Sequence, residues 1–302
     1  MRPLFIKFLI IIYLIILNIN SSLAKEFKYD VRAYNLNVMD IIFNIDDEIN
    51  NKITFSAESV GIVGFFVKVS AKSKVEFNDK EKKTWKYDYR YEKPTINKYR
   101  LNKINFSKEK VINFETDPPR KEDLSKKIPY NKEDYFGVID PIFAVKKLFL
   151  IDKKNLDCNK KIKVFDGNIF YYLIMKKENT QLDFDSVFSN YKGKLNKCIL
   201  TYQPISGHIP GDPNTPEQFI VDLYFGIVGD NYFPIYATTK GKKGIRLKMY
   251  LDTIQWAIEF FIRITTLNFN VRKKIKQIIG LILISTNSLT VSSCGEEKKA
   301  PK

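Results

Sequence analysis

The sequence contains one histidine, His208, and three cysteines, Cys158, Cys198 and Cys294. A zinc ion needs several cysteine, histidine or carboxylate ligands, and structural zinc sites use four cysteine or histidine side chains. If two of the cysteines form a disulfide, only one cysteine and His208 remain for a structural site of this kind. We therefore predict no metal site, and the sequence shows no motif for another cofactor.

Motifs of common enzyme classes are also missing. The sequence has no Gly-x-Ser-x-Gly elbow, no phosphate-binding loop and no dinucleotide fingerprint. A hydrolase could use His208 as a base together with Asp166 or Asp212. However, Asp166 precedes a glycine, a pair typical of hairpin turns, and His208 stands among glycine and proline residues. We interpret these residues as turn residues and predict a protein that is not an enzyme, with the hydrolase as the alternative.

Arginine-rich blocks and nucleic-acid-binding motifs are absent, although the chain carries a net charge of +16 at pH 7. The lysines are interleaved with acidic residues along the chain, which is typical of a solvated surface. We expect no nucleic-acid partner. Weak contact with an anionic membrane surface is the alternative interpretation of the basic charge.

Residues 1–24 have the features of a secretory signal peptide. Arg2 and Lys7 precede or flank an apolar run over residues 8–17, and Ser22-Leu23-Ala24 supplies small residues at its end. The run is short for a membrane span, so we predict export and cleavage after Ala24, with an uncleaved anchor as the alternative. In an oxidising compartment two cysteines of one domain are expected to pair. We predict a disulfide between Cys158 and Cys198.

Apolar and polar residues alternate with period two over most of residues 25–253, for example along 27–33, 65–77 and 85–91. This pattern is typical of antiparallel strands with one face on a core and one in water. We predict a mainly β domain of about ten strands, folded as an antiparallel curved sheet or a partly closed barrel. Asp140 and Pro141 predict the start of one short covering helix over 141–150. The charged stretch 115–137 predicts a long surface loop.

Several short motifs follow one another between residues 27 and 252. They are Asp140-Pro141-Ile142-Phe143-Ala144, Cys158 with Val164-Phe165-Asp166-Gly167, Cys198 with Pro204-Ile205-Ser206-Gly207, and Phe233-Pro234-Ile235 before Thr239-Lys240-Gly241. Their order and spacing resemble an exported bacterial family known as domain of unknown function 3108. The resemblance implies a periplasmic location and a β fold, and by its name it implies no activity.

Residues 254–302 depart from this pattern. Residues 254–270 predict a helix, and a basic cluster, an apolar run over 278–284 and small residues before Cys294 resemble an internal lipoprotein leader. We interpret this helical, apolar tail as a fusion or as a membrane anchor, and we predict that the domain folds without it.

The leading functional hypothesis is a non-enzymatic periplasmic protein whose curved sheet binds a lipid-like ligand or an envelope protein. A purely structural scaffold is a further alternative. Two strands supply the inward-facing apolar rows of the predicted groove: Trp85, Tyr87, Tyr89, Tyr91, Phe219, Val221, Leu223 and Phe225. Burying one such side chain contributes roughly 1.5–3 kcal/mol, so we expect a groove beside the single helix to be filled. An acyl chain, a partner or the segment 254–270 could fill it.

Overall fold

The computed structural model describes residues 25–46, 51–79, 81–119, 126–211, 219–240 and 244–256. The predicted leader lies outside these ranges, and so does the predicted helical tail apart from residues 254–256, which end the last strand. The described part up to Gln255 forms one compact unit.

Strands make up most of the described chain. They are β1 (Lys25–Ala33), β2 (Leu36–Asp46), β3 (Lys52–Ser59), β4 (Ser70–Phe77), β5 (Thr84–Lys93), β6 (Lys98–Ser107), β7 (Lys110–Asp117), β8 (Val138–Ile139), β9 (Ile151–Asp152), β10 (Lys160–Phe165), β11 (Phe170–Asp185), β12 (Lys192–Ser206), β13 (Phe219–Val228), β14 (Asn231–Lys240) and β15 (Arg246–Trp256). The helical segments of the same ranges are α2 (Gly61–Phe66), α3 (Pro141–Phe149) and the 3-10 turns η1 (Pro94–Ile96) and η3 (Lys132–Tyr135). In these ranges no helix is long and apolar enough to cross a membrane.

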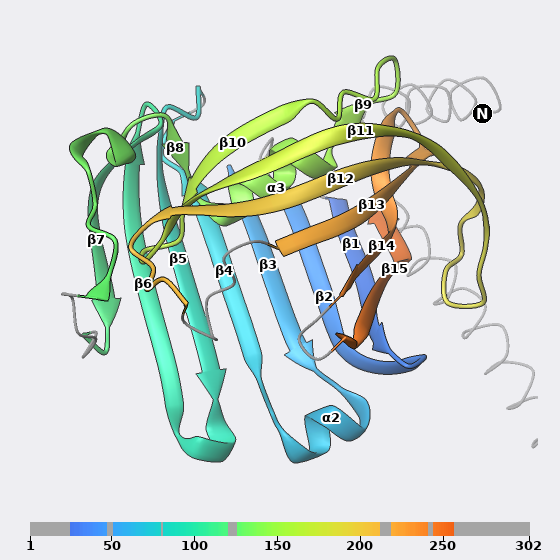
Figure 1. Cartoon of the computed structure of the whole chain (residues 1–302), viewed down its shortest axis with the longest axis horizontal. Helices are drawn as coiled ribbons and strands as arrows, with labels where there is room; N and C mark the ends of the chain where they lie inside the picture. The colour runs from blue at the N-terminus through green and yellow to red at the C-terminus, as the bar shows by residue number, and fades with distance from the viewer. Residues whose placement is uncertain are drawn as a thin grey trace, which may run out of the picture. The chain divides into compact units, whose positions relative to one another are not determined.

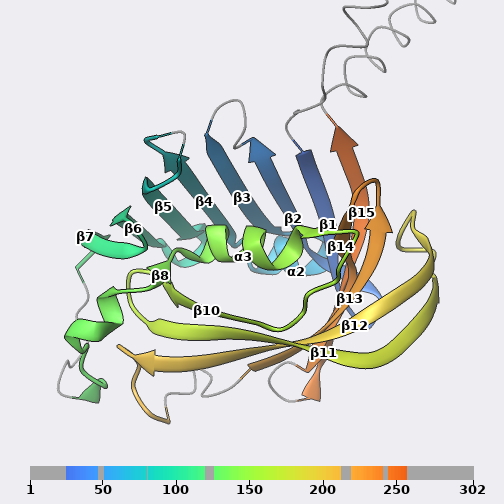
Figure 2. The same cartoon turned by 90° about the horizontal axis from the view of Figure 1, so that it is seen from above.

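The strands form one sheet of fifteen strands in the described residues. The first wall, β1 to β7, and the second wall, β10 to β15, are both built from antiparallel neighbours, and β1 lies beside β15 where the walls join. The sheet curls so that β10 to β13 face the first wall across α3 (Figure 2). At the far ends the Val138 N–H donates to the Glu109 carbonyl over 2.9 Å. Lys110 also forms a bridge with Phe136, so the sheet is a nearly closed barrel.

Helix α3 lies inside this barrel because of its first residues and its apolar face. The Asp140 carboxylate accepts hydrogen bonds of 2.9 Å from the N–H groups of Ile142 and Phe143, and Pro141 occupies the first turn, where no N–H is needed. A third bond of 2.8 Å comes from the Trp85 indole of β5. The cap therefore starts the helix and ties it to the first wall. The predicted helix over 141–150 matches α3.

The buried side chains of α3 serve two apolar clusters. Ile142 and Ala144 pack in the larger cluster, which contains Trp85 and Tyr87 of the first wall. Leu148 packs in the smaller cluster, which contains Leu223 of the second wall and the cysteine pair. The structure joins Cys158 and Cys198 as a disulfide with Cα atoms 6.0 Å apart, as the sequence predicted. The helix thus packs against residues of both predicted rows.

The number of strands was underestimated, since the structure has fifteen rather than about ten. One reason is the two-residue strands β8 and β9, which are too short to show alternation. A separate error concerns α2: residues 65–69 alternate like a strand, but residues 61–66 form a helical turn. The predicted surface loop 115–137 is also partly wrong, because β7 runs to Asp117 and Asp134 is only 5% exposed.

The hairpin of β11 and β12 extends well beyond the expected strands. Its end folds against the face of β13 to β15 that is turned away from α3, where the rings of Tyr236 and Tyr250 pack in a tilted arrangement with centroids 5.1 Å apart. The Phe184 and Phe188 rings pack on this pair at 5.7 and 5.4 Å. The Ser189 hydroxyl donates to the Leu251 carbonyl over 2.7 Å, which fixes the hairpin to β15.

Candidate functional site

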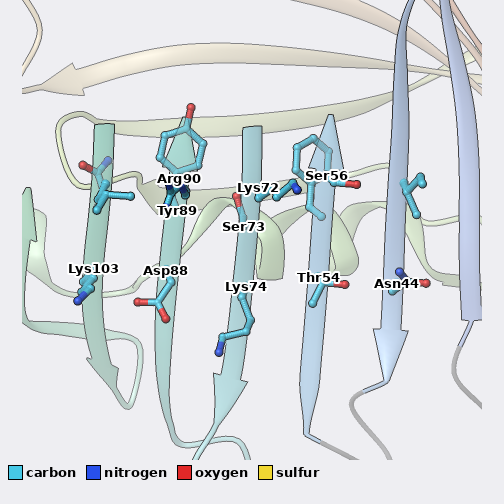
Figure 3. Close-up of a pocket in the computed structure, with 14 residues that line it drawn as sticks. Asn44, Thr54, Ser56, Lys72, Ser73, Lys74, Asp88, Tyr89, Arg90 and Lys103 are labelled. Carbon is cyan, nitrogen blue, oxygen red and sulfur yellow. The ribbon is translucent and has the colours of Figure 1, made fainter. Parts of the chain in front are cut away.

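A wide trough crosses the outer face of strands β2 to β6, with a volume of about 490 Å³ (Figure 3). Its sides are two rows of outward-facing side chains on neighbouring strands, the first Ile42, Ser56, Lys72, Arg90 and Leu101, the second Asn44, Thr54, Lys74, Asp88 and Lys103. Ion pairs hold Lys72 to Glu58 at 3.7 Å and Lys74 to Glu76 at 2.8 Å. Exposed pairs of this kind contribute little and are typical of a solvated face. The trough is therefore an open, solvated surface rather than an enclosed site.

A smaller inner hollow of about 260 Å³ lies on the inner face of the second wall. Its lining is aromatic and aliphatic apart from one acid: Asp166, Tyr171, Leu173, Leu200, Tyr202, Phe219 and Val221. The rings of Tyr171 and Tyr202 pack with centroids 4.7 Å apart. Tyr171 is buried, whereas Phe219 is 37% exposed, so the hollow opens to solvent beside Phe219.

Strand register explains why these residues meet. Leu173 of β11 pairs with Tyr202 of β12, and Tyr202 pairs with Phe219 of β13. Paired residues in an antiparallel sheet point to the same face, so one row across three strands lines the hollow. The preceding row, with Leu200 paired to Val221, forms its inner side.

Asp166 lies at the turn between β10 and β11. Its carboxylate accepts hydrogen bonds of 2.8 Å from the N–H groups of Asn168 and Ile169, and its carbonyl accepts one from the Asn102 amide of β6. Gly167 has a φ of +92°, and a Cβ there would lie 3.0 Å from the Asn102 side chain. Asp166 and Gly167 thus form a turn held against the first wall.

Tyrosines from both walls surround this acid. Burial raises the pKa of Tyr89 and of Tyr202 to about 12, and the negative charge of Asp166 adds to both shifts. Burial also raises the pKa values of Tyr87 and Tyr171 strongly, again with a contribution from Asp166. These phenols stay neutral at physiological pH, and two of them, Tyr171 and Tyr202, line the hollow and can donate hydrogen bonds to a ligand there.

The predicted groove residues do not share one environment. Trp85 and Tyr87 are buried in the core against α3, and Leu223 and Phe225 are buried in the cluster around Leu148. Phe219 and Val221 line the inner hollow. Tyr89 and Tyr91 are half-buried at the less covered end of β5. Of the predicted groove residues, Phe219 and Val221 thus line the inner hollow, and Tyr89 is among the residues that line the trough.

The hydrolase residues are placed only in part. Asp166 serves the turn described above, and His208 is 8% exposed, with its backbone carbonyl accepting a 2.9 Å hydrogen bond from the Ile128 N–H. Asp212 lies outside the described residues. The described residues contain no group of three or more His, Cys, Asp or Glu side chains that could hold a metal ion. The catalytic reading of these residues stays a hypothesis.

Asp134, which is buried in the structure as Asp140 is, was not identified from the sequence. Its carboxylate accepts hydrogen bonds of 2.7 Å from the Ser206 hydroxyl and 2.9 Å from the Asn131 N–H, and the Lys163 ammonium lies 3.4 Å away. Burial alone would raise the pKa of Asp134, but these contacts outweigh it and lower the pKa. The network ties the charged segment before α3 to strands β10 and β12. One sequence pattern could have indicated it: Asn131 followed three residues later by Asp134 is a capping pair at the start of a helical turn, here η3.

No protein-family model matches the chain, and no curated protein matches it. Among solved structures, a beta-barrel-like protein of domain of unknown function DUF1849 from Brucella abortus is similar, with a TM-score of 0.43 and 8% sequence identity. The similarity covers 78% of this chain and 98% of that protein. The resemblance to family 3108 stays a prediction, and the description of this chain as a nearly closed barrel rests on its own strand pairing.

Proposed function

We propose that the protein is a non-enzymatic, exported binding protein that holds the apolar chain of a lipid-like ligand in the inner hollow. The observation that carries the proposal is the lining, in which aromatic and aliphatic side chains of three strands leave an open space beside Phe219. Its volume of about 260 Å³ is just below the range of about 300–1,000 Å³ for small-molecule sites. A narrow chain suits it better than a bulky ring system. The leader pattern of residues 1–24 and the disulfide support export.

The polar rim favours one kind of ligand end. Asp166 is the acid of the lining, and the neutral Tyr202 phenol lies beside it. A ligand carboxylate near Asp166 would be repelled, because two like charges at short range disfavour each other. We therefore expect an alcohol or amine end to bind better than a carboxylate end.

A fluorescent aliphatic probe titrated into the full mature protein tests the proposal. Saturable binding is expected, with long-chain alcohols displacing the probe better than fatty acids of equal length. Leu200→Trp should fill the hollow and weaken binding at least tenfold, an effect of about 1.4 kcal/mol or more. Ile227→Trp is the matched control, because Ile227 is 48% exposed and lies on β13 outside the lining.

Two outcomes of the binding experiment would overturn the proposal. One is the absence of probe binding, which would favour an envelope protein partner or a scaffold role. The other is equal weakening by both tryptophan variants, which would show that the hollow isn't the binding site. If the protein hydrolysed an ester probe and His208→Ala abolished the activity, the hydrolase hypothesis would replace this one.

A further inference from the structure

Three hairpin tips of the first wall lie along one edge of the sheet. Each strand of this wall is antiparallel to the next, so β1, β3 and β5 all end at the same edge, which is the lower edge in Figure 1. All three tips expose large apolar side chains: Tyr34, Leu36, Ile62, Phe65, Phe66 and Ile96. We call these six residues the apolar tip edge. Large apolar side chains exposed together along one edge of a folded protein indicate an interaction site.

The middle tip is built to hold its side chains outward. Helix α2 has no buried residue, and Phe65 and Phe66 are 84% and 70% exposed. The Ser59 hydroxyl donates to the Val67 carbonyl and accepts from the Val69 N–H, both at 2.9 Å, which closes the base of the loop.

Two glycines set the orientation of α2. A Cβ on Gly61 would lie 2.8 Å from the Asn37 carbonyl oxygen, and a Cβ on Gly64 would lie 2.6 Å from the Ser59 carbonyl oxygen. The side of the turn without side chains therefore packs on β2 and β3, and the aromatic side faces solvent. The hydrogen-bonded base and this close packing give the exposed rings a fixed place.

Charge and shape indicate what covers this edge. Lys68 and Lys98 are exposed at the second and third tips, next to the apolar residues. Lysines beside a protruding apolar segment suit the interface of an anionic bilayer, where rings enter the acyl boundary and ammonium groups meet headgroup phosphates. A protein partner would instead need a flat, well-packed patch. Separate tips on three hairpins do not form one.

The inside of the barrel also opens toward this edge. Along β5 the inward row changes from Trp85 at 1% and Tyr87 at 3% exposure to the half-buried Tyr89 and Tyr91 near the tip. Figure 1 shows α3 across the other half of the first wall, away from α2. A bilayer at the tips would therefore face the less covered end of the interior.

We infer that the apolar tip edge docks the protein on an anionic lipid bilayer, with Phe65 and Phe66 inserted among the lipids. This inference does not depend on the ligand proposed for the inner hollow. The predicted tail of residues 254–302 is present in every variant compared below, so differences between variants report on the tips alone.

The test is sedimentation of the full mature chain with vesicles of phosphatidylcholine, with or without phosphatidylglycerol. Wild-type protein should sediment with the anionic vesicles, and the double variant Phe65→Ser, Phe66→Ser should bind at least tenfold more weakly. Val187→Ser is the matched control, because Val187 is 94% exposed in the turn between β11 and β12. Lys68→Glu should weaken binding only to the anionic vesicles, and added salt should reduce this difference.

A single-site reporter makes the result independent of sedimentation. Phe65→Trp should show a blue-shifted emission with anionic vesicles and quenching by brominated lipid chains. Equal vesicle binding by the double serine variant and the Val187 control would overturn the inference, as would no binding by the wild type. A tryptophan at 65 that lipid does not quench would also overturn it. Since both phenylalanines are exposed, the melting temperature should not change, which excludes loss of the fold as the cause.

Discussion

Replacing Asp140 by asparagine should remove a pH dependence of stability that the wild-type chain has. The carboxylate is fully buried at the start of α3 and accepts hydrogen bonds from Ile142, Phe143 and Trp85. Burial outweighs these hydrogen bonds and raises the pKa of Asp140 from 3.8 to about 6. The folded protein therefore binds this proton more tightly than the unfolded chain does.

The sign and size of the effect follow from linkage. Because the folded-state pKa is the higher one, acidification from pH 7 increases the free energy of unfolding through this group. Each pH unit between 3.8 and about 6 corresponds to about 1.4 kcal/mol, so the full contribution is about 3 kcal/mol. About 2 kcal/mol of it should be present at pH 4.5.

The assay is urea denaturation at pH 7 and at pH 4.5. For each protein we subtract the free energy of unfolding at pH 7 from that at pH 4.5. This difference should be about 2 kcal/mol lower for Asp140→Asn than for the wild type, because the variant lacks the stabilising protonation of Asp140. Asparagine keeps an oxygen for the helix N–H groups and loses the bond from the Trp85 indole. That loss is the same at both pH values and cancels.

Trp85→Phe provides a second, opposite test. It removes a donor that lowers the pKa of Asp140, so the pKa should rise further and the gain on acidification should increase. An Asp140→Asn variant with the same pH dependence as the wild type would refute the reasoning.

Two further changes test the covalent and polar ties of the second wall. Replacing both Cys158 and Cys198 by serine should lower the free energy of unfolding by up to about 4 kcal/mol, because the disulfide spans 40 residues, and a denaturant titration under oxidising conditions measures the loss. A double variant as stable as the wild type would contradict this. Asp134→Ala should cost about 2 kcal/mol, since it removes the acceptor of the Ser206 hydroxyl and the carboxylate that pairs with the Lys163 ammonium, which keeps its hydrogen bond to the Glu133 carbonyl. The loss should shrink as pH falls, because the lowered pKa of Asp134 makes its contribution present only above that pKa; a loss independent of pH would show that the charge is not involved.

Local patterns of the sequence were sufficient for the strands with one buried face. In β1 the alternation places Phe27 and Tyr29 inside, and in β5 it places Trp85 and Tyr87 inside. The helix start at Asp140 was also predictable, because an N-cap aspartate followed by proline is a local signal. The same alternation misled at residues 65–69, where glycine packing against β2 and β3 decides the structure and no local periodicity reports it.

The inner hollow could be predicted only in part, because it depends on contacts between distant strands. Phe219 and Val221 were placed in a groove from their own strand, but Tyr171 and Tyr202 join them through the register of β11 with β12. The burial of Trp85 and Tyr87 depends on where α3 lies, and one apolar helix face cannot indicate which of two walls it covers. Phe65 and Phe66 are exposed although aromatic residues are usually buried, so their residue type alone would predict burial.

The position of β1 beside β15 has a consequence for the order of folding. Within the first wall, every pair of adjacent strands from β1 to β7 is consecutive in sequence, so this wall can assemble as soon as it has been synthesised. Its edge at β1 then has no partner strand until the last described strand is made. During this interval the unsatisfied backbone groups of β1 and the apolar side chains of Phe27 and Tyr29 form a template for pairing with another chain. The hazard of aggregation is thus greatest in a nascent chain that lacks only its final strand.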